Sequence, residues 1–166
     1  MTFNTAPCTA QHLQLVMSLQ QQALDTAGDN GTLRRNSPEM LAACLHKPHL
    51  TLGAWAGNTL AAIAILYVPT PGDPEDLAPL LSHPSEVASA NYKLCIVAPP
   101  YRGHGLQRIL GAELERQASQ RGIGQLCATV SPLNAASLYN LQRLGYHIDR
   151  ELQKYGSTRL LVYKTL

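Results

Sequence analysis

The sequence predicts an α/β (α+β) fold in which helices pack on a mixed sheet. Apolar residues recur with helical spacing in some segments and with strand spacing in others, and glycine and proline residues separate these segments. The predicted order is helix, helix, hairpin, strand, helix, strand, helix, hairpin, without an internal repeat. Because 166 residues suffice for one hydrophobic core, we expect a single domain over residues 1–166.

Two helices are expected first. Thr9 can cap a helix over Thr9–Leu24, whose apolar residues fall on one face. A polar break, Asp25–Arg35, follows. The second helix is expected to begin at Ser37, with a proline in its first turn, and to run to about His46.

A hairpin follows these helices. The apolar runs Leu50–Ala56 and Leu60–Val68 flank Gly57-Asn58, which is a two-residue turn signal. The second run is apolar on both faces and therefore predicts a central strand. It is the longest apolar run, yet it has only about half of the roughly 18 residues that a membrane-spanning helix needs.

The segment Pro69–Ala90 is longer than an ordinary connection and holds five prolines. A short helix is expected around Glu75–Leu81. The segment has no Lys or Arg and carries four acidic residues: Asp73, Glu75, Asp76 and Glu86. Two interpretations stay open, a solvated surface excursion or a substrate loop that attracts a cationic amine.

The next segments predict a strand and a long helix. Asn91–Val97 is expected to be a strand that Pro99-Pro100 ends, and Gly103–Arg121 an amphipathic helix that Gly122 terminates. The inner stripe of this helix is expected to comprise Leu106, Ile109, Leu110, Leu114 and Ala118.

A strand, a short helix and a closing hairpin complete the prediction. The strand is expected at Ile123–Val130 and the helix at Asn134–Leu144. The hairpin pairs Tyr146–Tyr155 with Thr158–Thr165 around Gly156-Ser157.

The turn before the long helix is the most informative stretch: Ile96-Val97-Ala98-Pro99-Pro100-Tyr101-Arg102-Gly103-His104-Gly105-Leu106-Gln107. Its glycines can adopt positive φ and let a ligand approach the backbone closely. The first N–H groups of a helix lack intrahelical partners, and with the helix dipole and the Arg102 cation they form a cradle for a pyrophosphate. The turn is neither a dinucleotide G-x-G-x-x-G nor a Walker A loop, because no G-K-[ST] follows.

Two motifs resemble the GNAT superfamily of acetyl-CoA-dependent N-acetyltransferases. Arg102-x-x-Gly105 after the strand is similar to the family's acyl-CoA signature, R/Q-x-x-G-x-G/A. The stretch from Asn134-x-x-Ser137 to Leu144-Gly145-Tyr146 resembles the family's later helix, N-x-x-(A/S)…LG(F/Y). The expected helix and strand separate the two motifs, so the resemblance covers nearly the whole chain.

The resemblance implies a GNAT-like fold, with a mixed, mostly antiparallel central sheet of about six to seven strands flanked by about four helices. It also implies an acyltransferase that moves an acetyl group from acetyl-CoA to an amine acceptor by direct attack in a ternary complex. The acceptor would be a small amine or a protein or peptide amine, acetyl-CoA would be the co-substrate, and no metal is expected. The wording Arg102-Gly103-x-Gly105-Leu106-Gln107 and the Tyr155-Gly156…Arg159 segment resemble an uncharacterised bacterial branch of the superfamily.

The resemblance also implies a set of residues that bind coenzyme A. They are Ile96, Val97, Arg102, Gly103, His104, Gly105, Leu106, Gln107, Asn134, Ser137 and Leu141. Asn134, Ser137 and Leu141 share one helix face, because their spacing is i, i+3, i+7, and this face should meet the pantetheine arm. A backbone N–H near Val97 suits the donor that the thioester oxygen needs.

Two positions depart from the family pattern. Gln107 replaces the last Gly or Ala of the signature, but backbone donors do most of the cradling, so coenzyme A binding is expected to survive. Leu141 stands where many relatives carry a tyrosine acid. Tyr139 lies about 200° around the helix from Leu141 and is expected to be a packing residue.

The sequence names no catalytic base. Asn91, Tyr92 and Lys93 occupy the strand where relatives often place a carboxylate, and none of them is one. Tyr92, Glu86 and His83 are catalytic candidates by location alone. Water can serve instead, because alignment supplies much of the acceleration in acyl transfer. A second function therefore stays open, a non-catalytic acyl-CoA-binding module of the same fold.

Composition limits the partners and the compartment. A formal net charge of +2, from 13 Lys and Arg against 11 Asp and Glu, gives no reason to expect nucleic acid or a membrane as a partner. Met1–Cys8 lacks the pattern of a secretory signal. The cysteines are too scattered for a metal site, and we expect free thiols in a reducing cytoplasm: Cys8, Cys44, Cys95 and Cys127. A homodimer through the closing hairpin and the second helix stays open.

Overall fold

The computed structural model describes residues 1–28 and 30–166. Its strands are β1 (Asn4–Pro7), β2 (Leu50–Ala56), β3 (Thr59–Tyr67), β4 (Ser89–Val97), β5 (Gln125–Val130), β6 (His147–Lys154) and β7 (Ser157–Thr165). Its α-helices are α1 (Leu13–Ala27), α2 (Pro38–Cys44), α3 (Leu106–Gln120) and α4 (Ala135–Arg143). Short 3₁₀ turns lie at Ala10–His12, Ala78–Leu80 and Pro99–Tyr101.

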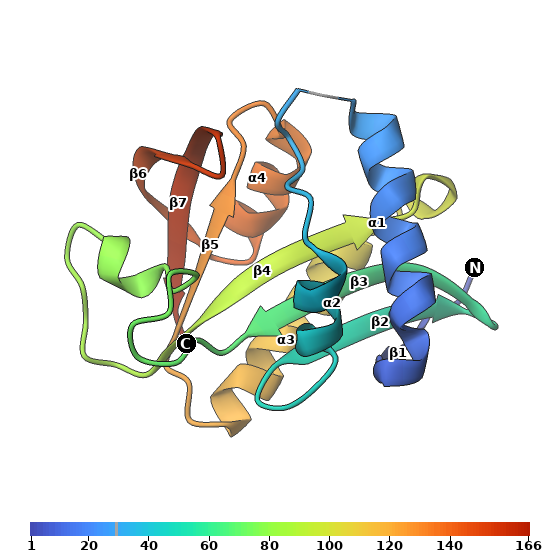
Figure 1. Ribbon diagram of the computed structural model, residues 1–166, viewed down its shortest axis with the longest axis horizontal. Coiled ribbons are helices and arrows are strands. Elements are labelled where there is room, and N and C mark those ends of the chain that lie inside the picture. Colours follow the sequence, from blue (N-terminus) through green and yellow to red (C-terminus); the bar gives the residue numbers. More distant parts are fainter. Residues whose placement is uncertain (29) are drawn as a thin grey trace.

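The strands of the described residues form one seven-stranded sheet in the order β1-β2-β3-β4-β5-β7-β6. Neighbouring strands are antiparallel except β4 and β5, which run parallel. Figure 1 shows α1 and α2 in front of the sheet and α3 behind it. The predicted mixed, mostly antiparallel sheet with flanking helices is confirmed.

Strand β3 lies in the middle of the core because it is apolar on both faces. Ala64 belongs to the apolar cluster that contains Leu110 of α3. Ile63, its neighbour in sequence, belongs to the cluster that contains Val16 of α1. Successive side chains of a strand point to opposite faces, so the small residues face α3 and the branched residues face α1. The predicted central strand is confirmed.

The N-terminal region differs from the prediction. β1 was not expected, because Asn4–Pro7 is short and lacks an apolar pattern, and it pairs with β2 at the edge of the sheet. The helix predicted over Thr9–Leu24 begins as a 3₁₀ turn and extends to Ala27, where Gly28 ends it with a φ of 68°. Asp29, inside the predicted polar break, lies outside the described residues.

The second helix and the first hairpin agree closely with the prediction. Ser37 caps α2, because its Oγ accepts a hydrogen bond from the Met40 N–H at 3.1 Å. The helix ends at Cys44, slightly before the predicted His46. β2 coincides with the predicted strand Leu50–Ala56.

The turn of the closing hairpin lies one residue earlier than predicted. Its two central residues are Tyr155 and Gly156, with φ values of 55° and 75°, and Ser157 already pairs with Lys154. Two successive positive φ values give the turn type whose twist matches that of the flanking strands. An aromatic residue rarely adopts this conformation, which is why the sequence pattern placed the turn at Gly156-Ser157.

Helix α3 starts later than predicted. Gly103 and Gly105 have φ values of 81° and 71°, so the chain becomes helical only at Leu106. The predicted inner stripe is correct except at Ile109, whose side chain is 47% exposed. Gly111 is buried in its place, where the helix packs closely against a leucine that follows α4.

The parallel pair β4–β5 opens toward the carboxyl ends of its strands. The two strands pair only at Ser89–Asn91 and Gln125–Cys127, although both continue beyond these residues. On its other side β4 has a β-bulge at Lys93, because Ile65 faces Leu94 while the next residue of β3 faces Tyr92. No helix in the described part of the chain is long and apolar enough to cross a membrane.

Candidate functional site

A groove of about 660 Å³, called the α3 groove here, runs from the N-terminus of α3 past the open end of β4 to the start of α4. Most residues predicted to bind a cofactor line it: Ile96, Val97, Arg102, Gly103, Gly105, Leu106, Gln107, Asn134 and Ser137. The fold therefore brings together the two motifs that lie far apart in the sequence.

The N-terminus of α3 presents main-chain donors to this groove. Its cap residue, Gly105, has no side chain to accept their hydrogen bonds. The Gly105 carbonyl already accepts from the N–H groups of Arg108 and Ile109, each at 3.1 Å. The N–H groups of Leu106 and Gln107 have no acceptor among the described residues. They are the orphan donors that an anion can use.

The space above the glycine turn is open. A Cβ atom added at Gly103 would have no heavy atom within 4 Å, and one at Gly105 would meet only the end of the Arg108 side chain at 3.6 Å. Arg102 is exposed beside the turn, and its Nε donates to the Val97 carbonyl at 3.4 Å. The turn therefore combines free amides, open space and exposed guanidinium groups, which suits a phosphate-bearing ligand.

The His104 side chain does not reach the α3 groove. Its Nδ1 lies 3.1 Å from the carbonyl oxygens of Tyr101 and Arg102. Its ring packs edge-on against Phe3, with 5.5 Å between the ring centroids. His104, one of the predicted cofactor-binding residues, is therefore part of the turn, but its side chain does not line the groove.

The side chain of Gln107 does not cover the turn, although it replaces a small residue of the family signature. Its Nε2 donates to Ser137 Oγ at 3.0 Å, and its Oε1 accepts from Asn140 Nδ2 at 3.1 Å. Asn134 in turn caps α4, because its Oδ1 accepts from the Ser137 N–H at 3.1 Å. The polar side chains at the start of α4 are therefore held in place by α3.

The open edge of β4 directs main-chain groups toward β5. The Ala98 N–H donates to the Ala61 carbonyl of β3 at 2.9 Å. Because these directions alternate along an antiparallel pair, the main-chain groups of Val97 and Cys95 point away from β3 and into the opening. A Val97 N–H in this orientation agrees with the predicted donor to a thioester oxygen.

A second, narrower cavity of about 70 Å³, called the inner cavity here, adjoins the α3 groove. The residues that line both are Thr32, Leu33, Cys95, Gln107, Asn134 and Ser137. The segment between α1 and α2, the strands β4 and β5, and the β6–β7 hairpin form its walls. Leu141 lines the inner cavity and not the groove, so the third residue of the predicted helix face lies deeper than the other two.

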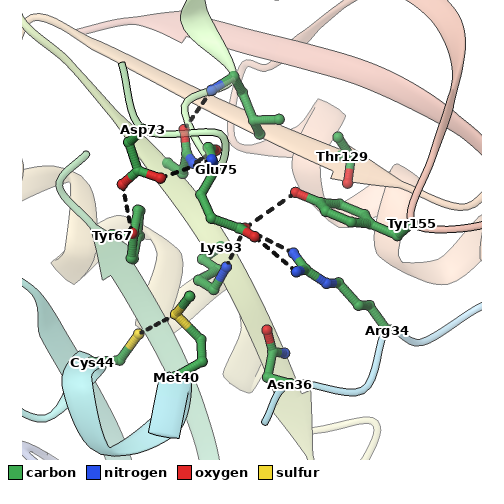
Figure 2. A network of polar contacts seen from close by, with 12 residues as sticks. Arg34, Asn36, Met40, Cys44, Tyr67, Asp73, Glu75, Lys93, Thr129 and Tyr155 are labelled. Atoms are coloured by element: carbon green, nitrogen blue, oxygen red, sulfur yellow. Dashed lines mark hydrogen bonds and ion pairs between the residues drawn. The ribbon is translucent and has the colours of Figure 1, made fainter. Parts of the chain in front are cut away.

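The acidic segment lies next to this cavity, because Glu75 is bonded to Arg34 and Lys93 of the cavity wall. Figure 2 shows its carboxylate between Arg34, Lys93 and Tyr155. Arg34 Nη1 and Nη2 donate to the two carboxylate oxygens at 2.9 Å each, and Lys93 Nζ donates at 2.8 Å. The hydrogen bonds from Arg34 are the main cause that lowers the pKa of Glu75 to about 2, against the opposing effect of burial.

Two further acidic residues of the Pro69–Ala90 segment accept hydrogen bonds from groups within the protein. Asp73 Oδ2 accepts from the Tyr67 hydroxyl at 2.6 Å, and Asp73 Oδ1 accepts from the Glu75 N–H at 2.9 Å. Asp76 Oδ1 accepts from the Ala78 N–H at 3.2 Å. The short helix expected at Glu75–Leu81 is reduced to the 3₁₀ turn at Ala78–Leu80. Glu75 is bound to two cations, whereas Asp73 and Asp76 accept from neutral donors and Glu86 is exposed, so both interpretations of the segment stay open.

Tyr155 sits over the same network. The Cζ atom of Arg34 lies 3.6 Å from its ring centroid, and its hydroxyl lies 3.5 Å from Glu75 Oε2. Burial raises the pKa of Tyr155 to about 12. The contacts with Arg34 and Glu75 explain how an aromatic residue is held at a positive φ.

The three catalytic candidates do not place a proton-transfer group in the cavity. Tyr92 lines it, but its hydroxyl is buried beside Gly111 of α3 without a hydrogen-bond partner, and burial raises its pKa well above the ordinary value. His83 and Glu86 are exposed on the Pro69–Ala90 segment and line neither cavity. The prediction that Tyr139 is a packing residue is wrong, because its side chain is 60% exposed at the edge of the α3 groove.

Sequence reasoning missed several residues of the inner cavity, namely Arg34, Asn36, Thr129, Tyr155 and Arg159. They come from segments far apart in the chain, so no local motif contains them. One signal was present, because Arg159 directly precedes the apolar residues Leu160–Val162 of strand β7. Among the described residues, no group of three or more His, Cys, Asp or Glu side chains could hold a metal ion.

A sheet that opens beside an uncapped helix N-terminus is the arrangement expected for a coenzyme A-dependent acyltransferase. Residues 17–146 match the family model described as acetyltransferase (GNAT) family, so the chain belongs to this family. The activity of the family is the transfer of an acetyl group to an amine, with acetyl-CoA as the co-substrate. The resemblance predicted from the two sequence motifs is confirmed.

Solved structures show the same fold at low sequence identity. The ribosomal-protein-S18-alanine N-acetyltransferase of Escherichia coli is 18% identical, with a TM-score of 0.75, and the match covers 99% of this chain and 94% of that one. The ribosomal-protein-alanine N-acetyltransferase of Brucella melitensis is 21% identical, with a TM-score of 0.75 and coverage of 98% and 99%. The PaiA N-acetyltransferase of Thermoplasma acidophilum, solved in complex with coenzyme A, is 14% identical, with a TM-score of 0.70 and full coverage of both chains, 100% each. No curated protein matches the sequence.

Proposed function

We propose that this protein is an N-acetyltransferase that binds the pyrophosphate of acetyl-CoA at the N-terminus of α3 and acetylates an amine bound in the inner cavity. The observation that carries the proposal is the continuity of the α3 groove with the inner cavity through shared residues. Such a path suits a ligand with a diphosphate at one end and a long thioester arm at the other.

The proposed phosphate contacts use main-chain donors that have no acceptor among the described residues. The N–H groups of Leu106 and Gln107 would donate to the phosphates, and Arg102 would add a cation at the same place. The open space above Gly103 admits the phosphates close to the backbone. Asn134 and Ser137 would line the path of the pantetheine arm.

Acetyl transfer from a thioester to an amine requires few catalytic side chains. Acetyl-CoA supplies an activated thioester, and in the net reaction an N–C bond replaces the C–S bond while the amine loses a proton and the coenzyme leaves as a thiol. We propose that the Val97 N–H donates to the acetyl oxygen as negative charge develops there. Among the described residues, no Asp, Glu or His lines the inner cavity. We therefore propose that water takes the amine proton and that alignment provides most of the acceleration.

The test is a thiol-release assay with acetyl-CoA against amines, amino acids, aminoglycosides and peptides, run beside a thermal-shift titration with coenzyme A. Turnover of any acceptor, with saturable stabilisation by coenzyme A, supports the proposal. Stabilisation without turnover of any acceptor would favour the non-catalytic acyl-CoA-binding module. Absence of binding would contradict both functions.

Two further properties remain proposals. The cysteines at positions 8, 44, 95 and 127 are free thiols, which favours a reducing compartment such as the cytoplasm. A homodimer through the β6–β7 hairpin and α2 stays a prediction, and sedimentation equilibrium of the purified chain tests it.

A further inference from the structure

The inner cavity is surrounded by more positive than negative charge. Arg34, Lys93 and Arg159 line it, and the carboxylate nearest to them belongs to Glu75. Glu75 is bonded to Arg34 and Lys93, and the side chain of Lys93 is only 4% exposed. The charge of Arg159 is therefore left without a carboxylate partner in the described part of the chain.

Arg159 is held rigidly at the cavity wall by neutral acceptors. It is only 7% exposed. Its Nε donates to Thr129 Oγ1 at 2.8 Å, Nη2 to the Thr129 carbonyl at 3.3 Å and Nη1 to the Gly31 carbonyl at 3.5 Å. A guanidinium has five N–H groups, so one on each terminal nitrogen remains without an acceptor among the described residues. A buried cation with two such donors is costly to the fold unless an anion binds to it.

A second buried polar group in the same cavity has an oxygen that accepts no hydrogen bond. Asn36 is 4% exposed, and its Oδ1 has no hydrogen-bond partner. The orientation of this amide is set by Gln20, because Asn36 Nδ2 donates to Gln20 Oε1 at 3.4 Å. Figure 2 shows Asn36 on the side of the network nearest Lys93 and Arg34. Oδ1 can accept a hydrogen bond from an amine N–H, which is the group that this reaction acetylates.

The strained residue of the closing hairpin, Tyr155, lies close to both guanidinium groups. The Cζ atoms of Arg34 and Arg159 lie 3.6 and 6.0 Å from the ring centroid of Tyr155. The hairpin turn thus places one aromatic ring against both arginines. Strain of this kind concentrates at ligand sites.

We infer that the acceptor is a small amino-acid-type molecule, whose carboxylate binds Arg159 and whose amine donates to Asn36 Oδ1. This inference rests on the proposed function and names the substrate class of the same site. It differs from one of the two interpretations of the acidic segment, a substrate loop that attracts a cationic amine. The small volume of the inner cavity favours a free small molecule over a residue within a folded protein.

The experiment compares matched pairs of acceptors in which a neutral amide replaces the carboxylate, at equal concentrations of the deprotonated amine. Each standard amino acid and its carboxamide are assayed for thiol release from acetyl-CoA, and each is also titrated in a thermal-shift measurement on the coenzyme A-bound protein. At least one acid should exceed its carboxamide by about tenfold or more in kcat/KM, because a buried cation recognises a carboxylate strongly.

Variants assign the preference to Arg159. Arg159→Met, which keeps an unbranched stem and removes the charge, should raise the KM of the preferred acid by about tenfold or more and leave coenzyme A affinity unchanged. Arg159→Lys should retain part of the preference. Arg143→Met, which removes an exposed arginine of α4, is the matched control and should change neither parameter.

The outcomes separate the two proposals. Equal turnover and equal thermal shifts for acids and carboxamides, or shifts for no acid, would overturn the carboxylate subsite while coenzyme A binding still supports the proposed function. Loss of coenzyme A binding in the wild-type protein would overturn the proposed function itself. If Arg159→Met does not fold, the matched pairs on the wild-type protein decide the inference alone.

Discussion

Gln107 Nε2 donates to Ser137 Oγ at 3.0 Å and thereby fastens the start of α3 to the start of α4. The position that departs from the family signature is thus a contact between helices and not an obstruction over the glycine turn. Both walls of the α3 groove are positioned by this contact. The structure explains why a residue with a long side chain is compatible with the cradle.

Replacing Gln107 with alanine should loosen the two helices and leave the cradle intact. The variant loses hydrogen bonds to Ser137 and Asn140, which should lower the free energy of unfolding by about 1–2 kcal/mol. Coenzyme A affinity should change by less than about threefold, because backbone donors provide the cradle. Urea unfolding and calorimetric titration measure the two effects, with the exposed Gln142→Ala as the control. A large loss of affinity with unchanged stability would place Gln107 on the phosphates instead.

A side chain at Gly105 should block the cradle. Gly105→Val places a branched residue at a φ of 71° directly at the first free amides of α3. Coenzyme A binding should weaken by about 2–3 kcal/mol, because phosphate hydrogen bonds are lost and the space is filled. Gly122→Val is the matched control, since Gly122 has a φ of 76° just beyond the other end of α3. Equal affinities of the two variants for coenzyme A would contradict the site.

The stability of the protein should depend on the charge of Glu75. Its folded-state pKa of about 2 lies below the ordinary value, so its contribution is complete above about pH 5 and is lost as the pH falls toward 2. Glu75→Gln should therefore be less stable than wild type at pH 7, by about 2–3 kcal/mol, and the difference should shrink in this window. Urea unfolding at stepwise lower pH measures this.

The control for that series is Glu113→Gln. The pKa of Glu113 is also lowered to about 2, chiefly by its hydrogen bond to Arg116, but this pair lies at the surface. Exposed ion pairs contribute little, so the control should unfold almost like wild type at every pH. A difference between Glu75→Gln and wild type that persists unchanged to pH 2 would show that the carboxylate charge is not what matters.

The acetylation rate should rise with pH, and its pH profile should show no inflection from the titration of a histidine or carboxylate base. No Asp, Glu or His among the described residues lines the inner cavity, and the pKa of Tyr155 is about 12. At saturating acetyl-CoA, kcat/KM for the acceptor should therefore rise about tenfold per pH unit up to the pKa of the acceptor amine. Acceptors with lower amine pKa values should move the plateau accordingly. A fixed inflection near pH 6–7 for all acceptors would reveal a general base.

The fold could be predicted because its signals are local. Alternating or helical apolar patterns and glycine turns lie within single segments, as in β2 at Leu50–Ala56 and in the turn with Gly103 and Gly105. The exceptions have physical reasons. β1 is a short polar edge strand, and the hairpin turn shifted because Tyr155 adopts a conformation that sequence patterns assign to glycine.

The α3 groove and the inner cavity also differ in how far the sequence could predict their residues. The α3 groove follows one motif and its helix, so most of its residues could be named in advance. The inner cavity brings together Arg34, Lys93 and Arg159 from separate segments of the chain. Lys93 lies at the bulge of β4, and its side chain donates to Glu75. Only the assembled fold makes these residues neighbours, so the charge of the cavity could not be inferred from the acidic segment alone.

The position of coenzyme A on the protein tests the account most directly. Titration of ¹⁵N-labelled protein with coenzyme A should perturb the backbone amides of Leu106 and Gln107 most strongly, followed by that of Val97 at the opening of β4. Saturable shifts confined to these amides and to the α3 groove are the predicted result. Binding that leaves the Leu106 and Gln107 amides unperturbed, or shifts confined to another face, would contradict it.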